Sequence, residues 1–409
     1  MTSLNIGSLV EINNDFTVKN RLFKSAMSEQ LGDKYHNPTT GLFQVYKTWA
    51  EGGIGLSVTG NVMIDRTALG EPKNVVLDEQ SDLSLFEQWA KAGKVNNSKI
   101  WMQLNHPGKQ IPSFLSKEPV APSAISLGKG LDKAFNKPRA LTEPEIIAII
   151  DKFATSAKFA KDAGFDGVQI HGAHGYLVSQ FLSARHNKRE DKWGGSLENR
   201  MRFVVELYDA MRSKVGSEFP IGIKLNSADY MKGGFTPEES MQVIKKLGDI
   251  GIDLIEISGG TYESPSMVGH KIKDSTKARE AYFLDYAEQA RSIVSTKLVV
   301  TGGFRSTKAM NNALASGATD MVGLARPLAI YPHLPNQAMQ DELFTAFVPT
   351  PTTGLRGVDK MAMLSITWFE TQIARIAKGK SPKSDLSAWV TVIGIMKDMG
   401  RQAFKPRRA

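Results

Sequence analysis

Between residue 22 and about residue 330, short apolar runs alternate regularly with long amphipathic stretches, and no other feature of the sequence restricts its fold as strongly. Such alternation is typical of parallel strands joined by helical crossovers. The predicted strands are Leu22–Ser28, Gly55–Thr59, Ile100–Leu104, Asp166–His171, Pro220–Asn226, Asp253–Ser258, Leu298–Thr301 and Asp320–Ala325. The clear helical patterns that follow them are Leu42–Glu51, Leu83–Val95, Glu143–Ala163, Leu197–Val215, Pro237–Ile250, Tyr282–Val294 and Thr307–Ser316. Eight such units favour an α/β fold of the (β/α)8 TIM barrel type over an open sheet.

Two segments lie outside this repeating pattern. Leu9–Arg21 is predicted to form a hairpin with its turn at Asn13-Asn14-Asp15, which would cap the amino-terminal end of the barrel. Residues 341–409 are predicted to form a basic helical extension packed on or near the barrel. The expected organisation is therefore a barrel over residues 1–340 followed by this extension.

The absence of cysteine from all 409 residues limits the chemistry of the chain. It excludes disulfides, thiolate-bound zinc, iron–sulfur clusters and cysteine nucleophiles, so any redox chemistry would need a bound organic cofactor. The sequence also lacks a leader-like amino terminus and any run of about 18 apolar residues. We therefore expect a soluble, cytoplasmic protein without a membrane partner.

The formal charge of +9 is concentrated near the carboxyl end. From Thr371 onward there are nine basic residues against Asp385 and Asp398. The basic residues are Arg375, Lys378, Lys380, Lys383, Lys397, Arg401, Lys405, Arg407 and Arg408. Basic tails are usually solvated helix faces or oligomer contacts, and no aromatic residues are interleaved here for base stacking. We expect no nucleic-acid partner, and the pattern does not decide between a monomer and a homo-oligomer.

The densest concentration of reactive side chains follows the fourth predicted strand. His171 and His174 stand three residues apart, and a tight turn through Gly172 would aim both at the barrel mouth. Two neutral imidazoles can donate hydrogen bonds to one substrate oxygen and stabilise negative charge there, while the phenol of Tyr176 can deliver a proton. A metal pair or two structural histidines are the alternatives, but no acidic third ligand accompanies them. We therefore predict a substrate site without a metal.

A second group of residues is typical of a phosphate site. Thr301-Gly302-Gly303-Phe304-Arg305 ends the seventh strand and opens a helix, so glycine amides and the helix amino terminus would face an anion. Arg326 ends the eighth strand beside them. Barrels commonly bind phosphate at this position, although a simple glycine turn is the alternative reading.

From residue 1 to about residue 370, the sequence resembles the old yellow enzyme family of FMN-containing NADH:flavin oxidoreductases and ene-reductases. One block of the resemblance runs from His171-Gly-Ala-His174-Gly-Tyr176 through Asn187, Arg189, Asp191 and Trp193-Gly-Gly-Ser196 to Glu198-Asn-Arg200. Four further blocks occur in the family's order, namely Asn20-Arg21 with Ser25-Ala-Met-Ser28, Gln103-Leu-Asn-His-Pro-Gly108, Thr301-Gly-Gly-Phe304 and Ala325-Arg326-Pro327.

The resemblance implies an FMN site across the barrel mouth. It implies that the phosphate binds at Gly302, Gly303, Ala325 and Arg326, although the family commonly has glycine at the position of Ala325. The implied contacts to the flavin ring are Ser25, Ala26, Met27, Ser28, Gly60, Gln103, His171 and Lys224. Lys224 shares strand parity with Gly222, so it should point into the barrel, where a buried charge needs a partner, and reduced flavin would provide one. Gln30 stands where one subgroup has a phenol, which leaves Tyr176 as the only named proton donor.

The resemblance also implies a ping-pong reaction. NADH or NADPH would reduce FMN, and an electrophilic alkene, an α,β-unsaturated carbonyl or nitro compound, would then accept hydride with its oxygen held by His171 and His174. Related enzymes that add an iron–sulfur cluster are excluded by the lack of cysteine. Two alternatives stay open at this point, namely an FMN-dependent amine dehydrogenase or demethylase on the same barrel and a flavin-free phosphate-binding lyase barrel.

Overall fold

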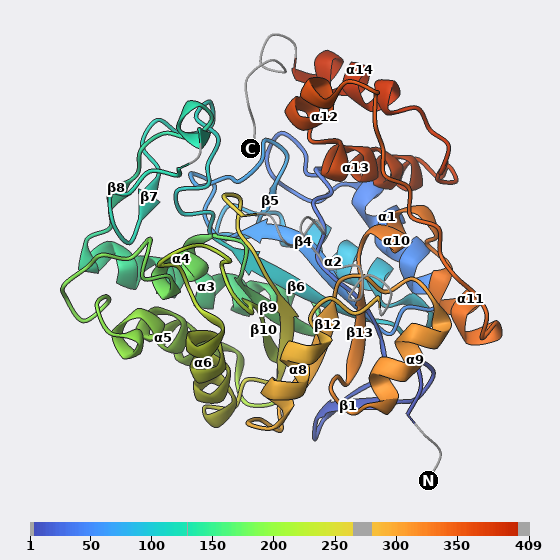
Figure 1. Cartoon of the computed structure of the whole chain (residues 1–409), viewed down its shortest axis with the longest axis horizontal. Coiled ribbons are helices and arrows are strands. Elements are labelled where there is room, and N and C mark those ends of the chain that lie inside the picture. Colours follow the sequence, from blue (N-terminus) through green and yellow to red (C-terminus); the bar gives the residue numbers. More distant parts are fainter. Residues whose placement is uncertain (1–3, 129, 265–279, 400–409) are drawn as a thin grey trace.

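The computed structural model describes residues 4–128, 130–264 and 280–399 (Figure 1). Arg401, Lys405, Arg407 and Arg408 of the predicted basic tail therefore lie outside the described residues.

Eight parallel strands form a closed barrel at the centre of the molecule (Figure 1). They are β3 (Leu22–Lys24), β4 (Leu56–Met63), β6 (Lys99–Asn105), β9 (Gly167–Gly172), β10 (Ile221–Asn226), β11 (Leu254–Ser258), β12 (Lys297–Thr301) and β13 (Met321–Leu324). Each strand pairs with the next in this order, and β13 pairs with β3, so the ring of eight strands is closed. The predicted TIM barrel is confirmed.

Helices cover the outside of the barrel because their apolar faces need a partner and the strands are buried on both sides. They are α1 (Thr40–Glu51), α2 (Leu83–Gly93), α3 (Glu143–Asp162), α5 (Leu197–Val215), α6 (Pro237–Asp249), α8 (Leu284–Arg291) and α9 (Thr307–Ala315). Local sequence sets several of their starts. Capping boxes formed by Thr142 with Glu145 and by Thr236 with Glu239 begin α3 and α6.

The predicted hairpin closes one end of the barrel. Strands β1 (Val10–Asn13) and β2 (Phe16–Val18) pair in antiparallel register around a turn at residues 14–15. Their buried side chains join a core cluster with Trp101 and Met321 of the barrel strands. The hairpin thus seals the amino-terminal end of the barrel with an apolar plug, opposite the end from which the long loops leave.

The first two barrel strands differ from their predicted lengths. β3 ends at Lys24 rather than at residue 28, because the backbone leaves the sheet once the Lys24 side chain has entered a buried cluster with Glu29 and Tyr46. β4 continues past residue 59 to Met63, where it also pairs with the short strand β5 (Val75–Val76). Ala26, Met27 and Ser28, just beyond β3, lie outside the strand and line the barrel mouth.

In the described part of the chain, the helices that follow the last barrel strand are α10 (Arg326–Ile330), α11 (Leu334–Gln340), α12 (Arg356–Ala362), α13 (Leu364–Ala377) and α14 (Ala388–Met399). Helix α13 packs against α1 and α10, and α12, α13 and α14 lie together above the barrel, at the end away from β1 (Figure 1). The buried face of α13 includes Trp368, Phe369 and Ile373. A division of the chain into two domains at residue 340 stays a prediction.

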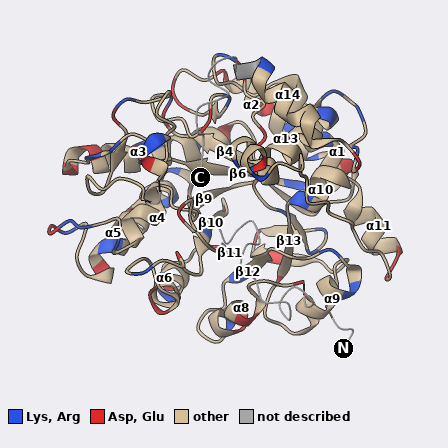
Figure 2. Cartoon of the chain, turned by 45° about the horizontal axis from the view of Figure 1, so that its top comes forward, with Lys and Arg blue, Asp and Glu red and all other residues tan. Residues whose placement is uncertain are grey.

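Basic and acidic side chains are mixed over the outer helices, including α5, α6 and α8 (Figure 2). Many of them form exposed pairs one helical turn apart, such as Lys158 with Asp162 and Lys245 with Asp249. Within the described ranges, no helix combines the length and the apolar character that crossing a bilayer requires.

Candidate active site

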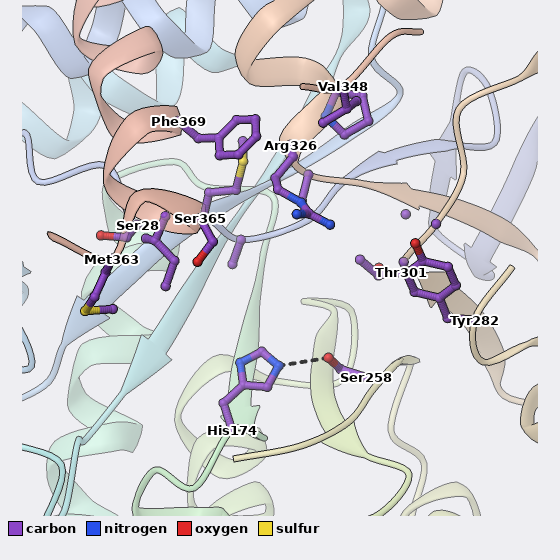
Figure 3. A pocket seen from close by; sticks show the side chains of 18 of the residues that line it. Ser28, His174, Ser258, Tyr282, Thr301, Arg326, Val348, Met363, Ser365 and Phe369 are labelled. Atoms are coloured by element: carbon purple, nitrogen blue, oxygen red, sulfur yellow. Dashed lines mark hydrogen bonds between the residues drawn. The ribbon is translucent and has the colours of Figure 1, made fainter. Parts of the chain in front are cut away.

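One large pocket, with a volume of about 1030 Å³, opens at the carboxyl ends of the barrel strands (Figure 3). In a β/α barrel this end carries the catalytic groups. Of the predicted site residues, those that line the pocket are Ala26, Met27, Ser28, Gln103, His171, His174, Tyr176, Lys224, Gly302, Gly303, Ala325 and Arg326. The structure therefore brings together residues from six strands and their following loops.

Ser25 and Gly60, which were also predicted, do not line this pocket. The Ser25 hydroxyl lies 2.8 Å from the Thr301 hydroxyl, behind the wall. The amide of Gly60 donates to the Tyr46 phenol at 3.0 Å, and a Cβ at this position would meet the Met27 carbonyl oxygen at 2.5 Å. Both residues thus support the segment that includes Met27 instead of forming the pocket surface.

The turn that presents the two histidines begins two residues later than expected. Gly172 is the last residue of β9, and the backbone turns at His174 and Gly175, with φ values of +62° and +79°. The amide of His174 donates to the Asn226 side chain at 3.2 Å, which holds this uncommon backbone conformation in place. The imidazole rings of His171 and His174 lie 5.1 Å apart in an edge-on arrangement.

The surroundings of His171 in the folded protein favour the neutral form of its ring. Burial removes water from its ring and, together with the charges of His174 and Lys224, holds the pKa of His171 well below its usual value. The amide of Ala173 donates to Nδ1 at 3.3 Å, so the neutral ring carries its proton on Nε2. Because the unfolded chain binds this proton more readily, the stability contributed by the neutral ring is lost as the pH falls below about 6.5.

A hydrogen bond to the end of strand β11 orients the ring of His174. Its Nε2 atom lies 2.8 Å from the hydroxyl of Ser258, the last residue of β11, and Figure 3 shows this bond crossing the pocket floor. The carbonyl of His174 accepts a hydrogen bond from Gln110 at 3.1 Å. Both histidines are therefore held in fixed positions before any ligand binds.

A second phenol, which sequence reasoning missed, meets the predicted proton donor. The hydroxyl of Tyr176 lies 2.6 Å from the hydroxyl of Tyr262, and the two rings pack edge to face. Tyr262 lies in the loop after β11 and also lines the pocket. The motif around Tyr176 contains no signal for this partner, because the two residues are separated by 86 positions in the chain.

Lys224 points into the barrel as predicted, but its partner is a protein carboxylate. Its Nζ atom lies 3.0 Å from Glu256 on β11, the residue directly opposite in the parallel register. Both side chains are buried. Lys224 therefore has a counter-charge on the neighbouring strand that the sequence did not reveal, and its contact with a flavin stays a prediction.

Glu256 is also the centre of a polar network beneath the pocket floor. It accepts hydrogen bonds from Gln169 at 2.9 Å and from Thr301 at 2.8 Å, and Gln103 donates to Gln169 at 2.7 Å. Both carboxylate oxygens are thus hydrogen-bonded, as a buried charge requires. The network fixes the positions of Gln103 and Lys224, two of the polar side chains predicted to contact the flavin ring.

This network predicts a large loss of stability when its carboxylate is removed. Glu256→Leu should lower the free energy of unfolding by about 3–5 kcal/mol, because Lys224 would be left as an uncompensated buried charge. The double variant Lys224→Met with Glu256→Leu should recover part of that loss. Urea unfolding of the flavin-free proteins, followed by circular dichroism, measures both. A double variant less stable than Glu256→Leu would show that the pair is not the source of the effect.

The predicted anion site lies at the ends of β12 and β13, with one change. Gly302 and Gly303 have φ values of +128° and +97°, which only glycine adopts readily, and both border the pocket. The amides of Arg305 and Ser306, at the amino terminus of α9, instead bind the carboxylate of Glu280, each at 2.8 Å. The helix terminus predicted to face an anion is therefore already capped by the protein.

Arg326 remains as the charged residue of this predicted anion site. Burial and the nearby charge of Arg305 lower the pKa of Arg326. Its guanidinium lies 5.8 Å from the centre of the Phe369 ring, and within the described part of the chain it forms no ion pair with a carboxylate. Figure 3 shows it reaching into the pocket beside Phe369. An unpaired guanidinium in a pocket wall is suited to an anionic ligand.

The carboxyl-terminal helices form the upper wall of the pocket, which the sequence analysis did not foresee. Residues from α12 and α13 that line it are Arg356, Asp359, Lys360, Leu364, Ser365, Ile366, Phe369 and Ile373. Gln30, close to the pocket-lining residue Ser28, donates to Glu370 of α13 at 2.8 Å. An amphipathic helix without a motif gives no sequence signal for such a contact.

The sequence matches the NADH:flavin oxidoreductase / NADH oxidase family over residues 10–343. Among curated relatives, the NADH-dependent flavin oxidoreductase iliE of Hypocrea jecorina is 38% identical over 365 residues, which cover 83% of this chain and 90% of that protein. The match to this relative therefore extends over most of both proteins, and the family match spans all eight barrel strands.

Solved structures are similar in the same region. The old yellow enzyme homologue of Zymomonas mobilis has a TM-score of 0.71 and 26% identity, and the match covers 86% of this chain and 98% of that one. A 2-naphthoyl-CoA reductase has a TM-score of 0.80 and 26% identity, covering 91% of this chain and 57% of that one. Histamine dehydrogenase from Rhizobium sp. 4-9 has a TM-score of 0.73 and 28% identity, with coverages of 82% and 48%.

The family match and the curated relative agree with the arrangement of the pocket, in which a buried cation, two histidines and a phosphate-type glycine pair lie at one barrel mouth. The flavin-free lyase alternative is set aside by this agreement. The chain belongs to the NADH:flavin oxidoreductase family of old yellow enzyme type, and it is an FMN-dependent oxidoreductase.

Proposed function

We propose that this enzyme uses NADH or NADPH to reduce the C=C bond of α,β-unsaturated carbonyl or nitro compounds. The observation that carries the proposal is the convergence of His171, His174 and Tyr176 on one pocket wall. Two imidazoles can hold a substrate oxygen, and a phenol beside them can protonate carbon. A chain that only oxidised its nicotinamide would not need this combination.

The residues present fit an FMN cofactor. The glycine pair 302–303 and the unpaired guanidinium of Arg326 suit its phosphate, and a pocket of about 1030 Å³ leaves room for a substrate as well. Gln103 and Lys224, held by the network under the floor, are suited to hydrogen-bond the polar edge of the ring. Ala26, Met27 and Ser28 would pack beside it.

FMN, when bound, supplies a carrier that accepts hydride from the nicotinamide and delivers it to the alkene. Residues of the protein bind the substrate oxygen and supply the proton. His171 donates from Nε2 to the substrate oxygen and, with His174, favours negative charge on that oxygen. Tyr176 transfers its phenolic proton to the α-carbon, which completes the saturated product. The rigid placement of these groups lets them act without reorganisation.

The test is anaerobic. The purified yellow protein is reduced with NADH or NADPH and then mixed with a panel of enones, nitroalkenes and amines. Rapid reoxidation by enones and nitroalkenes, with a saturated product identified by mass spectrometry, supports the proposal. A reduced protein that no enone or nitroalkene reoxidises, and that is reoxidised only when oxygen is admitted afterwards, contradicts it.

Retention of the cofactor tests the anion site. Arg326→Ala should weaken FMN binding by about 10–100-fold, because a charge-assisted hydrogen bond to the phosphate is lost. The variant should purify paler than the wild type, and dialysis followed by absorbance spectroscopy measures the flavin that remains. Arg202→Ala on α5, which lies outside the pocket, is the matched control. Stoichiometric flavin in Arg326→Ala after dialysis would mean that the phosphate binds elsewhere.

Amine oxidation is the second candidate function. The similarity to histamine dehydrogenase favours it, although the chain covers only 48% of that protein. The same barrel would then accept hydride from an amine instead of passing hydride to an alkene. Reduction of the oxidised protein by an amine in the absence of nicotinamide distinguishes this candidate from ene-reduction.

A further inference from the structure

The loop that follows β11 contacts the active site through three consecutive residues. Thr261 forms a backbone bridge with His174, the residue whose positive φ sets the histidine turn. Tyr262 meets Tyr176 through its hydroxyl. Glu263 is buried and accepts a hydrogen bond from the amide of Gly128, in the long loop after β6, at 3.0 Å. One short segment therefore joins the histidine turn, the phenol and the loop over the pocket.

The two phenols differ in their surroundings. Tyr176 is the inner phenol of the pair, because it is only 4% exposed and its ring centre lies 4.8 Å from that of His171. Tyr262 is half-buried, and its ring packs at 6.2 Å from Phe135 beside Leu131, both in the loop after β6. The pair thus forms a short line of two hydroxyls from the histidines toward the outer loop.

Glu263 keeps Tyr262 in this position. Besides Gly128, it lies 3.3 Å from the ring of His186 and 3.6 Å from Arg185, both in the loop after β9. His186 is bonded in turn to the buried amine of Lys109 at 2.9 Å. The residue next to Tyr262 is therefore held by two separate loops, which leaves the Tyr262 ring little freedom to move away from Tyr176.

We propose that Tyr262 is a positioning residue that donates its hydrogen bond to Tyr176 and returns a proton to it after each turnover. The proposal rests on the proposed ene-reduction. Tyr176 breaks its O–H bond as the α-carbon gains a C–H bond, and the phenolate that results accepts the proton of Tyr262. Tyr262 then regains a proton from solvent, so the cycle consumes one water-derived proton for each alkene.

The direction of the shared hydrogen bond follows from the chemistry of a phenol. Each hydroxyl has one hydrogen, and only one of the two hydroxyls donates in the hydrogen bond that joins them. When Tyr262 is that donor, Tyr176 can direct its own O–H at the substrate, and negative charge that develops on its oxygen is already stabilised. The reverse direction would make Tyr262 the group that protonates substrate, but it is Tyr176 whose ring contacts His171, with 4.8 Å between ring centres.

Tyr262→Phe tests the proposal, since it removes one hydroxyl and keeps the ring packing. Loss of a hydrogen bond to a charged group predicts a fall of about 10–100-fold in the rate at which an enone reoxidises the reduced protein. In the Tyr176→Phe background, the same change should have no further effect, because the proton donor that it serves is gone. Tyr230→Phe, in the neighbouring loop and outside the pocket wall, is the matched control and should behave as wild type.

A readout without substrate separates failure of this proposal from failure of the proposed function. Ultraviolet titration of tyrosinate, taken as the difference between wild type and Tyr176→Phe, reports ionisation of Tyr176. The same difference measured in the Tyr262→Phe background should shift upward by about one pH unit, because the phenolate loses its donor. An unchanged titration, or an equal loss with and without Tyr176, overturns the dyad whether or not the enzyme reduces enones.

Discussion

Replacing Tyr176 by phenylalanine should slow the reduction of an enone by about 10²–10⁴-fold, the usual contribution of a positioned general acid. The reduction of the bound flavin by NADH or NADPH should keep its normal rate, because no proton from the protein is needed in that half of the cycle. The ring contacts of Tyr176 with His171 and Tyr262 survive the change, so only the hydroxyl is tested.

A nitroalkene provides the internal control for Tyr176→Phe. Its hydride adduct is a stable nitronate, so it should still oxidise the reduced protein rapidly and leave the nitronate to be protonated by solvent. Removal of the acid harms most the substrate whose carbanion is least stable by itself. Stopped-flow absorbance measures both half-reactions, and equal losses for enone and nitroalkene would show that Tyr176 only packs beneath the histidine turn.

Alanine at His171 should slow reoxidation by cyclohexenone by about 10²–10³-fold, the usual loss when one donor to a developing oxyanion is removed. Alanine at His174 should have a similar effect, although Ser258 would also lose its partner. Flavin reduction should be slowed far less in both variants. The effect should persist at neutral pH, because His171 acts as a neutral donor whose pKa lies well below its usual value.

Ligand binding checks the histidine assignment independently of turnover. Phenolates mimic the enolate product, so they should bind the wild type with a charge-transfer band and lose that band in both variants. His333→Ala, which changes an exposed residue at the start of α11, is the matched control. Unchanged phenolate binding in His171→Ala and His174→Ala would refute the role given to the pair.

The barrel could be predicted from the sequence because each strand and its following helix are coded locally. The helix from Leu197 to Val215 has the predicted bounds, and the other barrel helices end within a few residues of theirs. The errors fall where tertiary contacts decide. β3 stops at Lys24 because of a buried cluster built from distant residues, and β4 runs on to Met63 because β5 and β6 offer partners.

The candidate site could be predicted where its residues belong to local motifs at the strand ends. His171, His174 and Tyr176 are close in the chain, so their meeting needed little tertiary knowledge. Glu256 could have been suspected as the one acidic residue inside the apolar run of β11, but only the strand register shows that it faces Lys224. Tyr262 and the residues of α13 gave no local signal, because their contacts depend on where loops and helices pack.

The pocket wall formed by helices α12 and α13 has an evolutionary consequence. The strand ends hold the groups proposed to handle hydride and proton, whereas α12 and α13 contribute a separate wall that is anchored mainly through α1 and α10. Substitutions at Ser365 or Ile366 can therefore reshape the space offered to a substrate without disturbing a closed barrel. Selection for new substrates, in nature or in a directed library, has a region on which to act that is physically distinct from the machinery that makes the reaction possible.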